Sequence, residues 1–418
     1  MNKIAPSKKQ MQFLDWEFGA FFHFGIRTFY PGHRDWDGIE MPAEAFCPDE
    51  FDCRQWVKTV KEVGAKYAVM TTKHHDGFAL WPSAYTAYSV AASPWRGGKG
   101  DVVKEFTEAC RAENIACGLY YSPAQWGATA VRFENETEYD DYFIHQISEL
   151  LTNYGKIDYL WFDGCGSGDH EYDQKRIIGV IRTLQPDITI FGMWDPDTMW
   201  VGNEDGYAPI ANTGLIHTKV LGEEKDGYFP YECDCRLRGH WFCDRDVDTL
   251  KSVEELVGMY EYSVGRGANL LLNIGPDERG LLPEPDIARL REWRAELDRR
   301  YGSPLPFGEM KREDNRYSIS YTDEQLDEIW GDTDRIPLAS SVILREDISE
   351  GVAVRRFRLY AHIPSRHPIS DRMICVWQGE TIGHKCIIRF PAMRTPKLTL
   401  EILESDGDYQ IDEFKAYS

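Results

Sequence analysis

Short apolar runs alternate with amphipathic segments from the amino terminus to about residue 300. The apolar runs predict buried strands at residues 18–24, 67–72, 115–121, 157–162, 188–192 and 269–273. Apolar residues at helical spacing predict helices at residues 51–64, 101–113, 138–154, 175–184, 253–264 and 283–300. Because strands and helices follow each other in strict turn, the strands should be parallel and covered by helices. A barrel accommodates so many repeats better than an open sheet, so we expect an α/β fold with a (β/α)8-like TIM barrel as the catalytic domain at residues 1–300.

The pattern changes twice before the carboxyl terminus. Between residues 194 and 240, prolines, glycines and acids dominate, and no helix is predicted. A long irregular segment inside a compact domain tends to be functional. After a linker at residues 301–306, short alternating runs at 352–360 and 385–390 predict a C-terminal antiparallel β-sandwich at residues 307–418. A chain of 418 residues is long enough for these two domains.

Composition narrows the classes of partner. Lys and Arg number 47 against 69 Asp and Glu, and the resulting net charge of −22 repels phosphate backbones, so we expect no nucleic-acid partner. No run of eighteen apolar residues occurs, which argues against a membrane span. Thirteen Trp and 22 Tyr suit stacking on sugar faces, although protein cores also absorb aromatic residues.

Two features bear on the cellular compartment. The amino-terminal segment has basic residues but lacks the apolar stretch of a signal peptide. Ten cysteines are scattered without the spacing of a disulfide framework. We therefore expect a cytoplasmic protein with reduced thiols.

Asp163 is the first candidate for chemistry. It ends the apolar run at 157–162 and precedes Gly164. In one interpretation, Asp-Gly is an ordinary solvated turn after a buried strand. In the other, an acid at the carboxyl end of a barrel strand stands where such barrels keep their active sites, and Trp161 and Phe162 supply apolar walls.

Three histidines near strand ends are further candidates. His23 follows aromatic residues and is either a hydrogen-bonded core residue or part of a site. His74 and His75 follow the strand at 67–72, with Asp76 beside them. They suit either metal ligation or hydrogen bonds to a polyhydroxylated ligand, which we favour. Adjacent strand residues point to opposite faces, so both histidines ligate one ion only if the strand has already broken.

A second possible metal site lies in the irregular segment and has less support. Its members are Cys233, Cys235, His240 and Cys243. The spacing of these residues matches no common zinc finger. We therefore expect neither a metal nor another cofactor.

Several separated motifs together resemble glycoside hydrolase family 29, the α-L-fucosidases. They are HFG at 23–25, KHHDGF at 73–78, LWPS at 80–83, WFDG at 161–164 and NLLLNIGPDERG at 269–280. The likeness extends into the sandwich, where TIGHKCIIRFP at 381–391 is similar to the family's carboxyl-terminal pattern. WVGNEDG at 200–206 and GKGDVVKE at 98–105 look most like the subgroup that prefers α-1,3/1,4-linked fucose in branched glycans.

The resemblance implies a retaining mechanism with two carboxyl groups, which in such enzymes lie about 5–5.5 Å apart. Asp163 matches the family nucleophile, and Glu204 matches the acid/base of the subgroup. We expect Trp200 or bound substrate to limit the hydration of Glu204. Glu204 could instead be a solvated loop acid, and Glu232 is its main rival for the acid/base role.

The resemblance also implies a fucose pocket. His23, His74 and His75 correspond to histidines that bind fucose hydroxyls in the family, and Tyr121 and Trp241 are expected to shape the same pocket. Asp35 and Trp36 stand where the family often has Glu-Trp, and the shorter acid is expected to lose or relocate a hydroxyl contact. Other departures from the family pattern are Cys165-Gly166-Ser167 after WFDG and Ala124-Gln125 after the third strand. The expected partner is a fucosylated oligosaccharide.

Three functions of different classes compete. The first is a retaining α-L-fucosidase, which the pair Asp163 and Glu204 favours. The second is a metal-dependent barrel hydrolase using His74, His75 and Asp76, which chelation would inactivate. The third is a fucose-binding homologue with little turnover, which is disfavoured because no catalytic carboxylate is missing.

Overall fold

The computed structural model describes residues 4–34, 37–129, 133, 135–163, 170–243, 249–328, 333–363 and 372–418. Within these residues, eight parallel strands form one sheet in the order β5-β4-β3-β2-β1-β10-β9-β6. These strands are β1 (Phe18–Phe22), β2 (Tyr67–Lys73), β3 (Ala116–Tyr121), β4 (Tyr159–Phe162), β5 (Thr189–Phe191), β6 (Met199–Trp200), β9 (Tyr231–Arg236) and β10 (Asn269–Asn273). Phe191 at the end of β5 forms a bridge with Thr198 next to β6, so the sheet is a nearly closed barrel. The predicted barrel is confirmed.

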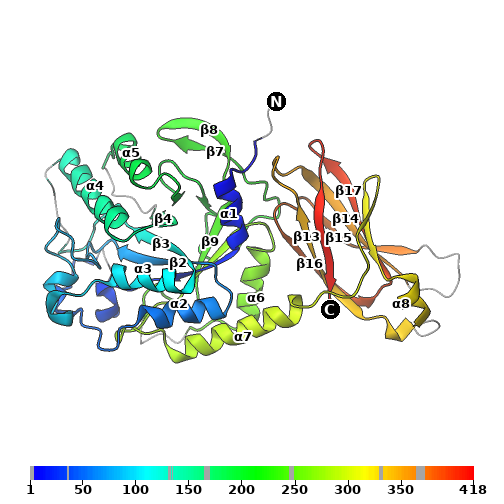
Figure 1. Cartoon of the computed structure of the whole chain (residues 1–418), viewed down its shortest axis with the longest axis horizontal. Helices are drawn as coiled ribbons and strands as arrows, with labels where there is room; N and C mark the ends of the chain where they lie inside the picture. Colours follow the sequence, from blue (N-terminus) through cyan, green and yellow to red (C-terminus); the bar gives the residue numbers. More distant parts are fainter. Residues whose placement is uncertain are drawn as a thin grey trace.

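Helices surround the barrel (Figure 1). They are α1 (Lys8–Trp16), α2 (Cys53–Glu62), α3 (Val102–Glu113), α4 (Glu136–Asn153), α5 (Gln174–Leu184), α6 (Val253–Tyr262) and α7 (Glu284–Tyr301). The side chains of Asp52, Asp101, Asn135 and Asp173 accept a backbone N–H at the start of α2 to α5, which fixes where these helices begin. Short 3₁₀ helices lie at Ile26–Phe29, Ala43–Ala45, Val90–Ala92, Trp95–Gly98 and Thr333–Arg335.

Alternation along the strands separates two apolar layers. Phe21, Tyr159 and Leu271 belong to the cluster inside the barrel. Their neighbours Phe22, Leu160 and Leu270 belong to the cluster between the strands and the helices. This period of two is what parallel strands covered by helices require, because each strand is buried on both faces. Among the described helices, none is both long enough and apolar enough to cross a membrane.

The prediction for residues 194–240 was wrong in part. The segment contains the barrel strands β6 and β9 and an antiparallel hairpin of β7 (Leu215–Val220) and β8 (Glu223–Tyr228). The hairpin is polar and largely exposed, so it has no apolar stripe to mark it in the sequence. Helix α1 was also not predicted.

Two antiparallel sheets follow the barrel (Figure 1). Their strands are β11 (Lys311–Glu313), β12 (Arg316–Ser320), β13 (Leu338–Glu346), β14 (Val354–His362), β15 (Met373–Gly379), β16 (Cys386–Arg394), β17 (Lys397–Ser405) and β18 (Ile411–Tyr417), with a short helix α8 (Asp323–Glu328). The five-stranded sheet supplies Phe357 and Leu400 to a shared apolar cluster, and the three-stranded sheet supplies Leu344 and Ile388. The predicted antiparallel sheets are thus present and pack as a sandwich.

The barrel and these sheets are joined by buried charges. Lys385 Nζ donates to a carboxylate oxygen of Glu17, the residue before β1, at 2.7 Å. The pKa of Glu17 is lowered despite burial, because Lys385 and Arg345 lie beside it. The contact is far from the carboxyl ends of the barrel strands, and it bears on stability rather than on chemistry.

Candidate active site

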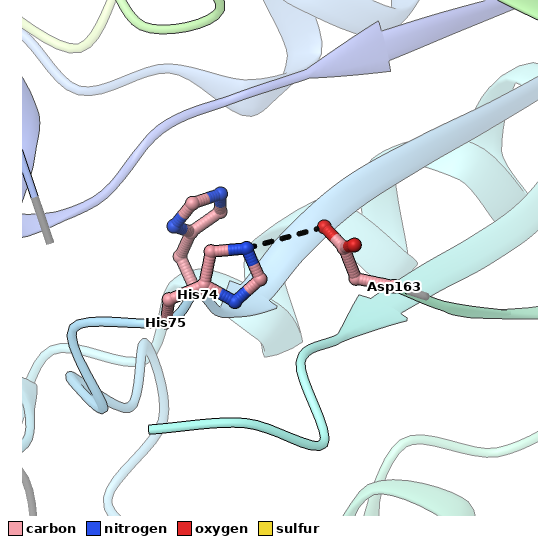
Figure 2. A group of neighbouring side chains, drawn as sticks. All are labelled: His74, His75 and Asp163. Carbon is pink, nitrogen blue, oxygen red and sulfur yellow. Dashed lines mark ion pairs between the residues drawn. The ribbon is translucent and has the colours of Figure 1, made fainter. Parts of the chain in front are cut away.

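Asp163 lies directly after β4, at the carboxyl end of the barrel. Tyr120 Oη donates a hydrogen bond to Asp163 Oδ2 at 2.7 Å. His75 Nε2 lies 3.4 Å from the same oxygen (Figure 2). The Asp163 side chain is 18% exposed, so it is held firmly but remains open to a ligand. A carboxylate in this position, with two oriented partners, is suited to act on a bound substrate.

His75 is fixed on both sides of its ring. Its Nδ1 lies 2.5 Å from the hydroxyl of Ser122, and its ring packs against Trp126 at a centroid distance of 4.5 Å. This contact at Nδ1 directs Nε2 toward Asp163.

His74 lies on the same side, because β2 has already ended at Lys73. Its ring stacks on Tyr120 with centroids 5.6 Å apart and an interplanar angle of 10°. His74, His75 and Asp163 each offer a ligand atom, and these atoms lie within 4.8 Å of one another (Figure 2). The strand break that one metal ion would require is therefore present, and the same geometry equally suits several hydrogen bonds to a polyhydroxylated ligand.

The third histidine of the site, His23, directly follows β1. Its Nδ1 lies 2.7 Å from Asn273 Oδ1, and Asn273 in turn donates to the backbone carbonyl of Trp241 at 2.7 Å. The Trp241 ring lies against His23 at a centroid distance of 4.8 Å. Burial, with a further contribution from His74, holds the pKa of His23 well below its ordinary value. A neutral imidazole has one donor and one acceptor, which suits a sugar hydroxyl.

Glu204 lies in the segment after β6, and its side chain is 46% exposed. It forms an ion pair with Arg236, 3.7 Å away. The Arg236 guanidinium lies 5.4 Å from the centre of the Trp241 ring, which connects Glu204 to the wall beside His23. The indole nitrogen of Trp200, on the same segment, donates to Asp234 Oδ1 at 2.7 Å.

Glu232 lies deep inside the barrel and is fully buried. Its carboxylate oxygens accept hydrogen bonds from Tyr67 at 2.6 Å, Tyr159 at 3.0 Å and Trp161 at 2.8 Å. Burial raises the pKa of Glu232 to about 7. An acid/base group must reach the leaving oxygen, so this enclosed position favours Glu204 over Glu232.

The placement of Tyr121 corrects the sequence prediction. Tyr121 points away from the barrel interior and donates to Gln146 of α4 at 2.7 Å. Its neighbour Tyr120 faces Asp163 instead, because adjacent strand residues point to opposite sides. Leu119 and Cys117 lie with Tyr121 in the outer cluster, which leaves Tyr120 on the inner face of β3.

Two further sets of predicted residues and one set of residues that were not predicted remain. Asp35, Trp36, Cys165, Gly166 and Ser167 lie outside the described residues. Cys233 and Cys235 are buried on the outer side of β9, and among the described residues they join no group of three metal-binding side chains. Ser122, Asn273, Trp126 and Asp234 were not predicted, although each lies near a strand end or within the irregular segment.

Comparison with known proteins gives a consistent result. A family model described as Alpha-L-fucosidase matches residues 2–298. Alpha-L-fucosidase 1 of Arabidopsis thaliana is 33% identical over 427 residues, which cover 92% of this chain and 81% of the plant protein. Plasma alpha-L-fucosidase of Homo sapiens is 29% identical over 58% of this chain and 52% of its own. The crystal structure of a glycoside hydrolase 29 family member from an unknown rumen bacterium superimposes with a TM-score of 0.87 and 29% identity, covering 99% of this chain and 77% of that one.

Proposed function

The chain belongs to the α-L-fucosidase family, glycoside hydrolase family 29, and we propose that it cleaves terminal α-1,3- or α-1,4-linked L-fucose from oligosaccharides with retention of configuration. The observation that supports the retaining mechanism is the pair of contacts that hold the Asp163 carboxylate. Tyr120 and His75 hold one of its oxygens in place at the carboxyl end of the barrel. A nucleophilic carboxylate needs this fixed aim, because its attack forms a covalent bond.

The reaction follows two displacements. Asp163 attacks the anomeric carbon while Glu204 donates a proton to the glycosidic oxygen, so that the bond to the leaving sugar breaks and a fucosyl ester forms. Glu204, now ionised, then removes a proton from water, whose oxygen attacks the same carbon and releases Asp163. Each step inverts the anomeric centre, and two inversions give net retention.

The pocket residues bind the fucose in this proposal. His23, His74 and His75 line the fucose-binding pocket, and Trp241 covers one face. Trp200 is 45% exposed, although its N–H is already bonded to Asp234, so its ring face is available to the leaving sugar. The linkage preference is supported by the WVGNEDG segment that carries Trp200 and Glu204.

Three measurements test this function. Proton NMR of an aryl fucoside digest should show α-L-fucose before mutarotation, whereas β-L-fucose as first product would refute retention. Glu204→Ala should still cleave an aryl fucoside and should form α-fucosyl azide with azide, because a good leaving group needs no proton. Glu232→Gln is the matched control, and azide rescue of that variant alone would move the acid/base role to Glu232. On a panel of oligosaccharides, preference for α-1,2- or α-1,6-linked fucose would contradict the proposed linkage.

We also propose a cytoplasmic location, with oligosaccharides as imported substrates. The cysteines that the structure describes are all unpaired, and Cys53, Cys110 and Cys117 among them are buried. Reduced thiols are typical of the cytosol. Mass spectrometry of the alkylated native protein should find no bridged cysteines, and several stable disulfides would contradict this location.

A further inference from the structure

The segment that carries Glu204 is attached to β9 by the backbone pairing of β6 with β9 and by three further contacts. Trp200 donates to Asp234 at 2.7 Å, Glu204 pairs with Arg236 at 3.7 Å, and Asp205 forms a bridge with Cys235. The first of these contacts differs from the others because it ends on an acid inside the barrel. An exposed loop gains a defined position only where a rigid element holds it, and β9 is such an element.

Asp234 lies on the inner face of β9. Its register partner on β10 is Leu271, a member of the cluster inside the barrel. Along the same face, Glu232 is one step deeper and Arg236 is one step nearer the rim. Asp234 is 5% exposed, and a carboxyl at this depth requires either a cation or a proton.

Most of the charged groups near Asp234 are other acids. Glu232 on the same strand and Glu204 on the loop both disfavour the ionisation of Asp234. The charge of Asp234 in turn helps to raise the pKa of the Tyr159 hydroxyl on β4. Arg236 is the neighbouring cation on β9, but it pairs with Glu204. Burial, opposed by the Trp200 hydrogen bond, raises the pKa of Asp234 to about 8. The carboxyl is therefore protonated at neutral pH.

We propose that Asp234 is a positioning residue for Glu204, which as a neutral acid holds the Trp200 indole and thereby fixes the segment that presents the acid/base. This inference rests on the proposed role of Glu204. Asp234 Oδ1 accepts from Trp200 without adding a negative charge beside Glu204. An ionised Asp234 would add a negative charge near Glu204, and the repulsion would disfavour the position of Glu204 beside Arg236.

The first experiment compares Asp234→Asn with Asp234→Leu. Asparagine retains an oxygen that accepts from Trp200 and never ionises, whereas leucine removes the acceptor at similar volume. Asp234→Leu should lose about tenfold to a hundredfold in kcat/KM on a fucosylated oligosaccharide, because proton donation contributes about 10²–10⁴-fold. It should lose less than about threefold on an aryl fucoside, which departs without that proton. Asp234→Asn should restore most of the oligosaccharide activity that leucine removes.

A second variant changes Trp200, the donor of the hydrogen bond to Asp234. Trp200→Phe removes the N–H donor at an exposed position, so it tests the contact even if Asp234→Leu fails to fold. It should show the same division between the two substrates. Infrared spectra should also contain a protonated-carboxyl band that disappears as the pH is raised through about 8 and that is absent in Asp234→Asn.

The inference is overturned if Asp234→Asn is as impaired as Asp234→Leu, or if both substrates lose activity equally. Either result would mean that Asp234 is needed for stability or as an ion rather than to position Glu204. Azide rescue of Glu204→Ala separates this failure from that of the proposed function, because that rescue does not depend on Asp234. If azide rescues Glu204→Ala but the Asp234 variants keep wild-type activity, the proposed mechanism stands and only the positioning role of Asp234 is refuted.

Discussion

Glu232 and Asp234 make the stability of the protein fall with rising pH. Burial raises the pKa of Glu232 from 4.5 to about 7 and that of Asp234 from 3.8 to about 8. Between about pH 5.5 and 6.5 the folded protein therefore holds two protons that the unfolded chain has released. One proton of difference changes the free energy of unfolding by about 1.4 kcal/mol per pH unit. Two protons give a slope of about −2.7 kcal/mol per unit.

The sign follows from the direction of both shifts. A raised carboxyl pKa favours the folded state below it, so the contribution is greatest near pH 4 and is lost as the pH rises through the folded pKa values. Well above pH 8 both groups are ionised in both states, and the slope from these two groups vanishes. Other titrating groups, such as His23, add their own slopes, but they are common to the wild-type protein and to variants on β9.

The assay is urea unfolding followed by tryptophan fluorescence at several pH values between about 5.5 and 6.5. Asp234→Asn and Glu232→Gln should each reduce the slope by about 1.4 kcal/mol per unit relative to the wild-type protein, and the double variant should reduce it by about 2.7. The comparison of slopes is insensitive to any constant loss of stability caused by the substitutions. Slopes that match the wild-type value would show that both carboxyls are ionised in the folded protein and would refute this reasoning.

Two further predictions concern the mouth of the barrel. Tyr120→Phe should lower kcat/KM by about tenfold to a hundredfold, because a hydrogen bond to a charged group contributes about 1.5–3 kcal/mol. Tyr121→Phe is the matched control. It should leave turnover unchanged and cost roughly 1 kcal/mol of stability, because the hydrogen bond to Gln146 is lost. Loss of turnover in Tyr121→Phe and not in Tyr120→Phe would contradict the orientation of β3. Dialysis against a chelator should leave turnover unchanged, because proton donation by a carboxyl needs no Lewis acid, and restoration by zinc would contradict the mechanism. Added zinc should instead inhibit competitively with substrate, since His74, His75 and Asp163 can converge on one ion.

The sequence predicted the barrel well because most of its strands are buried on both faces. Strands such as Tyr67–Lys73 and Asn269–Asn273 each contain a short apolar run, and the intervening helices have capped starts. The ends of these barrel elements differ from the predicted ones by at most two residues. Asp163 was found for the same reason, because it follows one of these runs at a position where barrels place their chemistry.

The tertiary contacts of the site could not be predicted in the same way. Adjacent tyrosines at 120 and 121 differ only in the face to which they point, and the difference depends on the register of β3 with its neighbours. The attachment of Glu204 to Arg236 joins a loop to a strand that was not recognised. Spacing along the chain gives no indication of either contact.

Strand β9 is one of the barrel strands that were not predicted, and it contacts the segment that carries Glu204. Its outer face carries Cys233 and Cys235, which are apolar enough to pack against the helices, but its inner face carries Glu232, Asp234 and Arg236. A barrel strand without a catalytic task would place apolar side chains at these inner positions, and the apolar run would then be visible in the sequence. The three charged residues lower the apolar content until the strand resembles a loop. Local patterns conflict with the global fold chiefly at functional sites. The strand whose apolar alternation fails is therefore the one expected to contact the proposed acid/base. Strand β9 contacts Glu204 through Arg236 and Trp200 through Asp234.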